Sequence, residues 1–379
     1  MFLSRSFRAG PLGPPSLLAM STASRRLPHI DALKALAAQV IVLHHLVSYG
    51  PIARAAHEAL PGLAGAMHDY GRMALQVFLV VGGYLSARAL SPRGKALEAG
   101  VPQLLWRRYL RLVLPFLAAL ALTLGACGLI ASSWPELVPA DITPGQLAAH
   151  ALLLHDVLGY EALTVGAWYV AIDLQLFALL VGLLWLARRG WRHPSRLVVG
   201  PVLVAGAALA SAFVFNRDPA MDAYAPYFFA AYGLGAMVHW LGLWQHRRAG
   251  LVLLAVAMAA ALEVDWRDRL ALALLTALVL AGAQARHAAG QPLVGERAAA
   301  LLARAATPSY ALFLLHFPVL LLTNALMAQL PGATPAIGLL LLAGTWLLAN
   351  GLAVPFHRWV EAPAARFDPL AWLPRRRTA

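Results

Sequence analysis

The sequence predicts an all-α polytopic membrane protein with about ten transmembrane helices and both termini in the cytoplasm. Three observations predict this class. Hydrophobic residues make up 60% of the 379-residue chain and charged residues only 12%, which is too little polar surface for a water-soluble domain. Apolar stretches of about 20 residues, the length that spans a bilayer as a helix, recur along the chain. Basic residues gather in short clusters between these stretches.

Ten apolar stretches follow one another, and each is expected to be a membrane-spanning helix. The seventh is the shortest, and the others are close to the length that the bilayer requires. They lie at 32–51, 70–89, 108–131, 166–187, 197–215, 226–244, 250–264, 270–285, 309–329 and 336–356.

A further apolar run, 146–163, is interrupted by His150, His155 and Asp156. These polar side chains would be costly facing lipid. We therefore predict one interfacial or re-entrant helix near 146–163 in place of another span.

The distribution of arginine supports this count. With the amino terminus inside, the basic clusters all fall on the cytoplasmic side, as the positive-inside rule requires. These clusters are Arg5 to Arg26, Arg88 to Arg111, Arg188 to Arg196, Arg247 and Arg248, Arg286 to Arg304, and Arg358 to Arg377. The arginines left outside are Arg54, Arg72, Arg217, Arg267 and Arg269.

The chain is expected to have three parts. Residues 1–27 would be a flexible cytoplasmic tail, unless Met20 is the true start, residues 28–365 the membrane-embedded domain, and residues 366–379 a basic cytoplasmic tail. The net charge of +13 does not indicate a nucleic-acid partner, because topology alone explains where the basic residues lie. The lone Cys127 rules out an intramolecular disulfide and a Cys-based metal site. No metal is expected.

The first stretch carries the most conspicuous polar groups. Lys34 and His45 are eleven residues apart, which puts them on one helix face with about 16 Å between them along the axis. His44 points roughly 80° away from that line. A cation at the inner boundary and a deep imidazole on the same face suit an anionic cytoplasmic donor. Histidines that only hydrogen-bond neighbouring helices are the alternative.

The second and third stretches add glycines and arginines. Gly82 and Gly83 allow close packing of helices. Arg108 and Arg111 are three residues apart and share a face at the inner boundary. The arginine fork is suited to phosphate oxygens, so both are candidate phosphate ligands. A positive-inside signal is the alternative explanation.

The later stretches contain isolated polar groups. Asp173 is a lone carboxylate in an apolar helix and needs a partner, such as a His or Arg on a neighbouring helix. His316, Asn324 and Asn350 are expected to form interhelical hydrogen bonds.

Taken together, these segments resemble the acyltransferase-3 family of integral membrane acyltransferases over roughly residues 28–365. The opening IDALKALAAQVIVLHH is similar to the family's first-helix pattern, a basic residue followed by ten residues and His, here Lys34 and His45. The family more often has Arg at the first position. RYLRLVLP matches the Arg-x-x-Arg pattern through Arg108 and Arg111.

Four further motifs extend the resemblance. FLVVGGYLSARAL is similar to the family's FFxxSGYL signature, with Gly82 in place of Ser. AWYVAIDLQLF looks like the WxLxxEwqFY segment, with Asp173 where Glu is usual. SYALFLLHFPV and the later RWVEAP, which contains Arg358 and Glu361, also fit.

The resemblance implies transfer of an acyl group, commonly acetyl, from acyl-CoA to a hydroxyl on a carbohydrate, lipid-linked glycan or other exported acceptor at the bacterial inner membrane. Lys34, Arg108 and Arg111 would meet the CoA phosphates. His45 would take the proton of the acceptor hydroxyl, a role suited to imidazole near neutral pH, and Asp173 would orient the ring. The acceptor would either meet the donor within the membrane or receive the acyl group through a covalent intermediate.

Two other classes fit part of the sequence. A transporter or flippase for a lipid-linked sugar also needs polar groups within many helices, and would have helices broken at matching positions in its two halves. A membrane haem protein would need pairs of facing histidines, for which His44, His45, His239 and His316 are candidates. The sequence does not predict an oligomeric state.

Overall fold

The fold is seen in a computed structural model, which describes residues 27–94, 97, 100–132, 138–139, 141–190 and 196–367. Within these ranges the regular structure is helical and no strand occurs. The predicted tails, residues 1–27 and 366–379, lie outside the described residues except for Leu27, Arg366 and Phe367.

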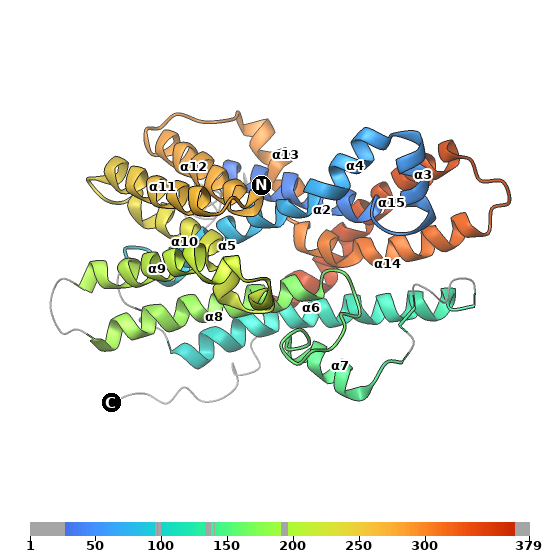
Figure 1. Cartoon of the computed structure of the whole chain (residues 1–379), viewed down its shortest axis with the longest axis horizontal. Helices are drawn as coiled ribbons and strands as arrows, with labels where there is room; N and C mark the ends of the chain where they lie inside the picture. The colour runs from blue at the N-terminus through green and yellow to red at the C-terminus, as the bar shows by residue number, and fades with distance from the viewer. Residues whose placement is uncertain are drawn as a thin grey trace, which may run out of the picture.

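Each of the ten predicted stretches overlaps a helix, the first of them crossing a break between two helices, and shorter helices lie between them (Figure 1). The first part of the chain forms α2 (Pro28–Leu46), α3 (Gly50–Ala59), α4 (Pro61–Tyr70), a 3-10 turn (Gly71–Ala74), α5 (Leu75–Leu90), α6 (Val101–Ile130), α7 (Pro144–Ala151) and α8 (Ala167–Gly190). The second part forms α9 (Arg196–Phe213), 3-10 turns (Phe215–Arg217 and Pro219–Met221), α10 (Ala225–Leu241), α11 (Arg247–Val264), α12 (Asp268–Ala288), α13 (Glu296–Ala306), α14 (Ser309–Ala328), α15 (Pro335–Phe356), a π turn (His357–Glu361) and α16 (Ala362–Ala364).

By length and composition, seven helical segments among the described residues are able to cross a membrane, and up to eight if the bent pair α2 and α3 forms one span. That pair bends by 96° at its break. Two of the ten predicted spans are not among these segments, one because its helix is too short and the other because its helix carries too many charged residues. The helix α10 has only 17 residues, and α11 begins with Arg247 and Arg248 and carries Glu263 near its end. The count of ten and the orientation of the termini remain predictions.

Helix α10 is buried along its whole length and packs against α5. Glycine makes this close approach possible, because a methyl group on Gly83 would overlap the carbonyl oxygen of Tyr232, and one on Gly235 would overlap that of Val80. Gly82 faces the ring of Tyr232. The predicted role of the glycine pair in helix packing is therefore confirmed.

The segment predicted as an interfacial or re-entrant helix near 146–163 is helical only in its first part, where α7 ends at Ala151, and continues as turns. Its histidines are buried, and the ring of His150 also stacks on Phe116 of α6 with centroids 6.4 Å apart. The rings of His150 and His155 stack with their centroids 4.2 Å apart, and the backbone N–H of Leu163 donates to His150 Nε2 at 3.0 Å. Burial lowers the pKa of His155 to about 4, so this ring is neutral near pH 7.

In Figure 1, α2 and α5 cross the middle of the molecule, with α11 and α12 on one side and α14 and α15 on the other. One buried core joins α5, α8, α9, α10 and α12. A second core joins α2, α6, α14 and α15. The polar groups of interest lie where α2, α5, α6, α8 and α14 meet between these cores.

Candidate active site

A cavity of about 510 Å³ lies among α2, α5, α6, α8 and α14, and we call it the cationic cavity. Its cations are Lys34, Arg107, Arg108 and Arg111. Its carboxylates are Asp173 and Glu361, and aromatic rings form part of its wall, namely Phe78, Tyr169, Phe177, Tyr310 and Phe313. Four basic groups against two acidic ones leave a net positive charge, which favours an anionic ligand.

The cations reach the cavity from two separate helices. Lys34 comes from the first third of α2, whereas the arginines come from the first turns of α6. The grouping of Lys34, Arg108 and Arg111 follows from their common position at one end of the bundle. Arg107 also lines the cavity and was not predicted, although it precedes Arg111 by four residues and so lies close to it on the helix surface.

Arg108 is engaged by the carboxylate of Asp173 on α8. Its Nη2 atom donates to Oδ1 at 2.8 Å and to Oδ2 at 2.5 Å, and its guanidinium lies 5.2 Å from the centroid of the Phe177 ring. The Nε atom of Arg108 is buried without a hydrogen-bond partner in the described part of the chain. The interhelical partner predicted for Asp173 is therefore an arginine, Arg108. Asp173 binds this arginine and does not make the expected contact with the ring of His45.

Glu361 enters the cavity from the π turn that follows α15. Its Oε2 atom accepts from His357 Nδ1 at 2.9 Å. Arg358, from the same motif, is exposed and does not line the cavity. Of the two charged residues in this motif, only the glutamate thus belongs to the site.

His45 is buried, with 8% of its surface exposed, and pairs with His316 of α14. The distance from His45 Nδ1 to His316 Nε2 is 2.7 Å, and the rings stack at 7° with centroids 4.8 Å apart. His316 Nδ1 in turn lies 3.2 Å from the carbonyl oxygen of Leu312. Nitrogen atoms this close hydrogen-bond directly, with no space for an iron atom between them.

The carbonyl oxygen of Leu312, the last hydrogen-bond acceptor in this series, determines the tautomers of both histidines. A carbonyl oxygen can only accept, so His316 Nδ1 carries a hydrogen, and the Nε2 atom of a neutral His316 is then an acceptor. His45 Nδ1 must donate to it, which leaves the lone pair of His45 on Nε2. The arrangement thus provides an oriented, neutral imidazole with an unprotonated nitrogen.

The histidine pair lies just beyond the cationic cavity. His45 does not line the cavity, but Phe313 does, and its ring centroid lies 6.1 Å from that of His316. Gly166 gives the Phe313 ring its place, since a methyl group there would come within 2.9 Å of the ring. The Phe313 side chain therefore adjoins both the cavity and the His316 ring.

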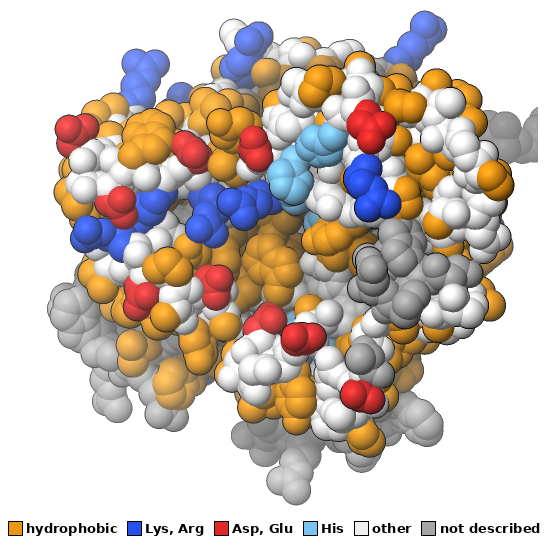
Figure 2. All heavy atoms as spheres, turned by 45° about the vertical axis from the view of Figure 1, so that its right-hand side comes forward, with side chains coloured by type: hydrophobic (Ala, Val, Ile, Leu, Met, Phe, Trp, Pro, Cys, Tyr) orange, Lys and Arg blue, Asp and Glu red, His pale blue; other side chains and the backbone are white. Residues whose placement is uncertain are grey.

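His44 takes a different direction from His45, as the helix geometry predicted. Its Nδ1 atom lies 3.2 Å from the carbonyl oxygen of Met67, and its ring approaches those of His45 and His68 with centroids 5.1 and 6.0 Å apart. His68 is exposed. Figure 2 shows histidine side chains at the surface on this side of the molecule, beside a hollow with a hydrophobic floor.

Comparison with known proteins adds one match. The sequence profile of the acyltransferase-3 family, described as an acyltransferase domain, matches residues 27–350. Neither a curated protein nor a solved structure matches the chain. The matched region covers most of the chain and includes α2, α6, α8 and α14, the helices that carry Lys34, Arg108, Asp173 and His316. The chain belongs to the acyltransferase-3 family of membrane acyltransferases.

Proposed function

We propose that the protein is an integral membrane O-acyltransferase, which moves an acyl group, acetyl in the first instance, from cytoplasmic acyl-CoA to a hydroxyl of a carbohydrate or other cell-envelope acceptor. One observation carries the proposal. In a chain of this family, a cation-lined cavity at one end of the bundle adjoins a buried imidazole that is held in one tautomer. The predicted topology puts the cations on the cytoplasmic side, where acyl-CoA is made.

The charges of the cationic cavity support acyl-CoA as the donor. CoA carries several phosphate charges, which basic side chains at a water-filled mouth attract. Lys34 and Arg111 would contact these phosphates directly. Arg108 is already bound to Asp173, so its contribution would come from its unpartnered Nε atom and from its charge. The aromatic wall would pack against the pantetheine arm of the donor, with the thioester toward Phe313.

His45 would act as the general base. Its Nε2 lone pair takes the proton of the acceptor hydroxyl as the oxygen attacks the thioester carbonyl carbon. The C–O bond forms, the C–S bond breaks, and CoA leaves as a thiolate that recovers a proton. The products are the ester and free CoA, so atoms and charge balance. Since Phe313 lines the cavity and lies next to His316, its ring would lie beside the path of the thioester toward Nε2.

Purified protein in lipid nanodiscs provides the test. Free CoA thiol is measured with acetyl-CoA and candidate glycan acceptors, for wild type, His45→Ala and His44→Ala. The His45 change should lower acceptor-dependent thiol release by about 10²- to 10⁴-fold, the usual contribution of a general base. His44→Ala is the matched control, because His44 belongs to the same helix and contacts Met67. Equal losses from both would remove His45 from the role of base.

The same assay separates the enzyme from a transporter or flippase for a lipid-linked sugar. A transporter would move the glycan without consuming acetyl-CoA. Absence of acceptor-dependent thiol release from protein that still moves a lipid-linked sugar would favour that alternative.

A further inference from the structure

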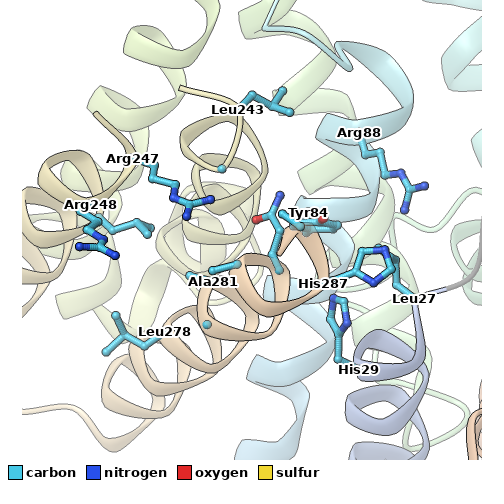
Figure 3. Close-up of a pocket in the computed structure, with 16 residues that line it drawn as sticks. Leu27, His29, Tyr84, Arg88, Leu243, Arg247, Arg248, Leu278, Ala281 and His287 are labelled. Atoms are coloured by element: carbon cyan, nitrogen blue, oxygen red, sulfur yellow. The ribbon is translucent and has the colours of Figure 1, made fainter. Parts of the chain in front are cut away.

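A second pocket lies on the other side of α5 from the cationic cavity, and we call it the α12 pocket. Its volume is also about 510 Å³. It is built by the start of α2, the end of α5, the turn between α10 and α11, and the end of α12 (Figure 3). Tyr84 and Arg88 of α5 face this pocket, whereas Leu85 and Ser86 face the cationic cavity. Nothing in the proposed acyl transfer uses the α12 pocket.

The polar groups of the α12 pocket are all basic or neutral. Arg88, Arg247 and Arg248 line it together with His29 and His287, and none of its sixteen described lining residues is Asp or Glu. In Figure 3 the Arg88 side chain descends toward His287, and Arg247 extends toward the middle of the pocket. Cations gathered in a recess without a carboxylate create a site for an anion.

His29 indicates that a ligand is needed here. Only 9% of its surface is exposed, and neither ring nitrogen has a hydrogen-bond partner within the described structure. Its ring faces that of His287, with centroids 6.3 Å apart (Figure 3). Buried polar groups are rarely left unpaired, because each such group costs free energy. An anionic group in the pocket would accept a hydrogen bond from this ring.

The chemistry of the lining favours phosphate as the anion. Arginine forks match phosphate oxygens, and several arginines with histidines suit a phosphate better than a single carboxylate. The remaining wall is aliphatic, formed by Leu27, Leu243, Leu251 and Leu278 with several alanines. Inorganic phosphate would make no favourable contact with such a wall, whereas an acyl chain would pack against it.

The pocket continues into the outer surface of the helices. Leu243 and Leu278 are 53% and 45% exposed, and the neighbouring faces of α11 and α12 present further exposed apolar side chains, among them Leu253 and Leu275. In a membrane protein, such a surface faces hydrocarbon. A ligand in the pocket can therefore place a charged head among the arginines and apolar chains along α11 and α12.

We propose that the α12 pocket binds the phosphate headgroup of an anionic phospholipid. All of its basic residues lie at the end of the bundle that the predicted topology assigns to the cytoplasm, where basic pockets between helices take anionic headgroups. The bound lipid joins α11 to α5 and α2. Helix α11 gains most from this, because Met258, Ala261 and Leu262 are its only buried residues in the described structure.

The test uses the full chain in nanodiscs of phosphatidylcholine, with and without phosphatidylglycerol. Lipid retention is measured by native mass spectrometry and stability by thermal unfolding. Wild type should retain phosphatidylglycerol and unfold at a higher temperature in its presence, whereas R88Q/R247Q should lose both effects. The matched control is R286Q/R304Q, which removes the same charge from exposed arginines at the same end of the bundle that do not line the pocket.

A variant of the aliphatic wall and two soluble phosphate compounds test the lipid assignment further. Leu278→Trp changes no charge but fills part of the aliphatic wall, and it should also reduce retention of phosphatidylglycerol. Equal loss in the two double variants would mean that net charge alone attracts the lipid, and would overturn the proposal. Inorganic phosphate or adenosine 3′,5′-bisphosphate is added to nanodiscs of phosphatidylcholine alone. Stabilisation of wild type but not of R88Q/R247Q by either compound would assign the pocket to a soluble phosphate instead.

Discussion

The hydrogen bond from His45 to His316 orients the ring of His45, the proposed base, but brings no negative charge next to it. A carboxylate in the position of His316 would stabilise the imidazolium that forms when His45 takes a proton. A neutral imidazole fixes the tautomer through the carbonyl oxygen of Leu312 but supplies no negative charge. The protonated state of His45 is therefore short-lived, and the proton must pass on as the thiolate leaves.

This arrangement predicts a positioning role for His316. His316→Ala should lower kcat by about fivefold, since one hydrogen bond contributes roughly 1 kcal/mol. The KM for acetyl-CoA should stay unchanged, because His316 does not line the cationic cavity. Steady-state kinetics of thiol release separate the two parameters. His316→Gln, whose side-chain amide can still accept from His45 Nδ1, should restore part of the rate; a rise in KM alone would argue against the role.

Arg108 and Arg111 should respond differently to substitution, although the sequence presents them as a pair. Arg111→Ala should raise the KM for acetyl-CoA by about tenfold or more, as expected for a lost charge-assisted hydrogen bond. Arg108→Ala should also destabilise the fold by about 3–5 kcal/mol, because it leaves the Asp173 carboxylate buried without its partner.

Thermal unfolding and the dependence of rate on acetyl-CoA concentration check the two effects together. The double variant Arg108→Ala/Asp173→Asn should recover much of the stability and keep the raised KM. If Arg108→Ala unfolds at the wild-type temperature, the ion pair contributes little to the fold.

Of the residues that the sequence singles out, Lys34, Arg108, Arg111 and Asp173 line the cationic cavity and His45 does not, and the contacts between them could not be predicted. Helix periodicity alone put Lys34 and His45 on one face and turned His44 away. The partners of Asp173 and His45 depend on which helices pack side by side, and the spacing of residues within one helix carries no such information. His316 was predicted to form an interhelical hydrogen bond, and only the packing of α14 against α2 identifies its partner.

At the scale of helices, the break between α2 and α3 is the feature that the apolar pattern concealed. The predicted stretch 32–51 runs through this break and includes the segment 48–51, which contains the turn. Gly50 makes the turn with φ of +83°, a conformation that favours glycine, and the side chain of Asn324 packs against it. Hydropathy reports burial in lipid, whereas the 96° bend contains a glycine with positive φ and is contacted by an amide from α14, neither of which hydropathy measures.

Asn324 should therefore control the stability of this break. Its Oδ1 atom accepts from the backbone N–H of Ile52 at 3.0 Å, and its Nδ2 atom donates to the carbonyl oxygen of Tyr49 at 3.0 Å. Asn324→Ala removes both hydrogen bonds, leaves the backbone N–H of Ile52 without this acceptor, and should lower the free energy of unfolding by about 1–3 kcal/mol. Hydrogen exchange at Ile52 should rise.

Thr276→Ala is the control for this change, because the Thr276 hydroxyl bonds the carbonyl oxygen of Leu272 in its own helix. The Tyr49 ring lies 6.0 Å from that of His45, centroid to centroid, so a loosened break should also reduce acyl transfer. Unchanged exchange at Ile52 in Asn324→Ala would show that the turn holds by itself.

At the scale of the whole molecule, both pockets and the arginine-rich ends of the helices lie at one end of the bundle, and the break, His57 and His68 lie at the other. Acyl-CoA does not cross lipid, so the proposed reaction requires the cationic cavity to face the cytoplasm. The hollow with the hydrophobic floor in Figure 2 would then face the acceptor outside the cell. This arrangement depends on the orientation that the positive-inside rule predicts.

Cysteine labelling in cells tests that orientation directly. The single Cys127 is buried and is first replaced by Ser, which gives a cysteine-free background. Exposed Glu58 on α3 and exposed Glu296 on α13 are then changed to Cys one at a time. A membrane-impermeant maleimide should label Glu58→Cys in intact cells and Glu296→Cys only after permeabilisation. Since acyl-CoA is confined to the cytoplasm, the reverse pattern would turn the cationic cavity away from its donor and leave the proposed acyl transfer without a substrate.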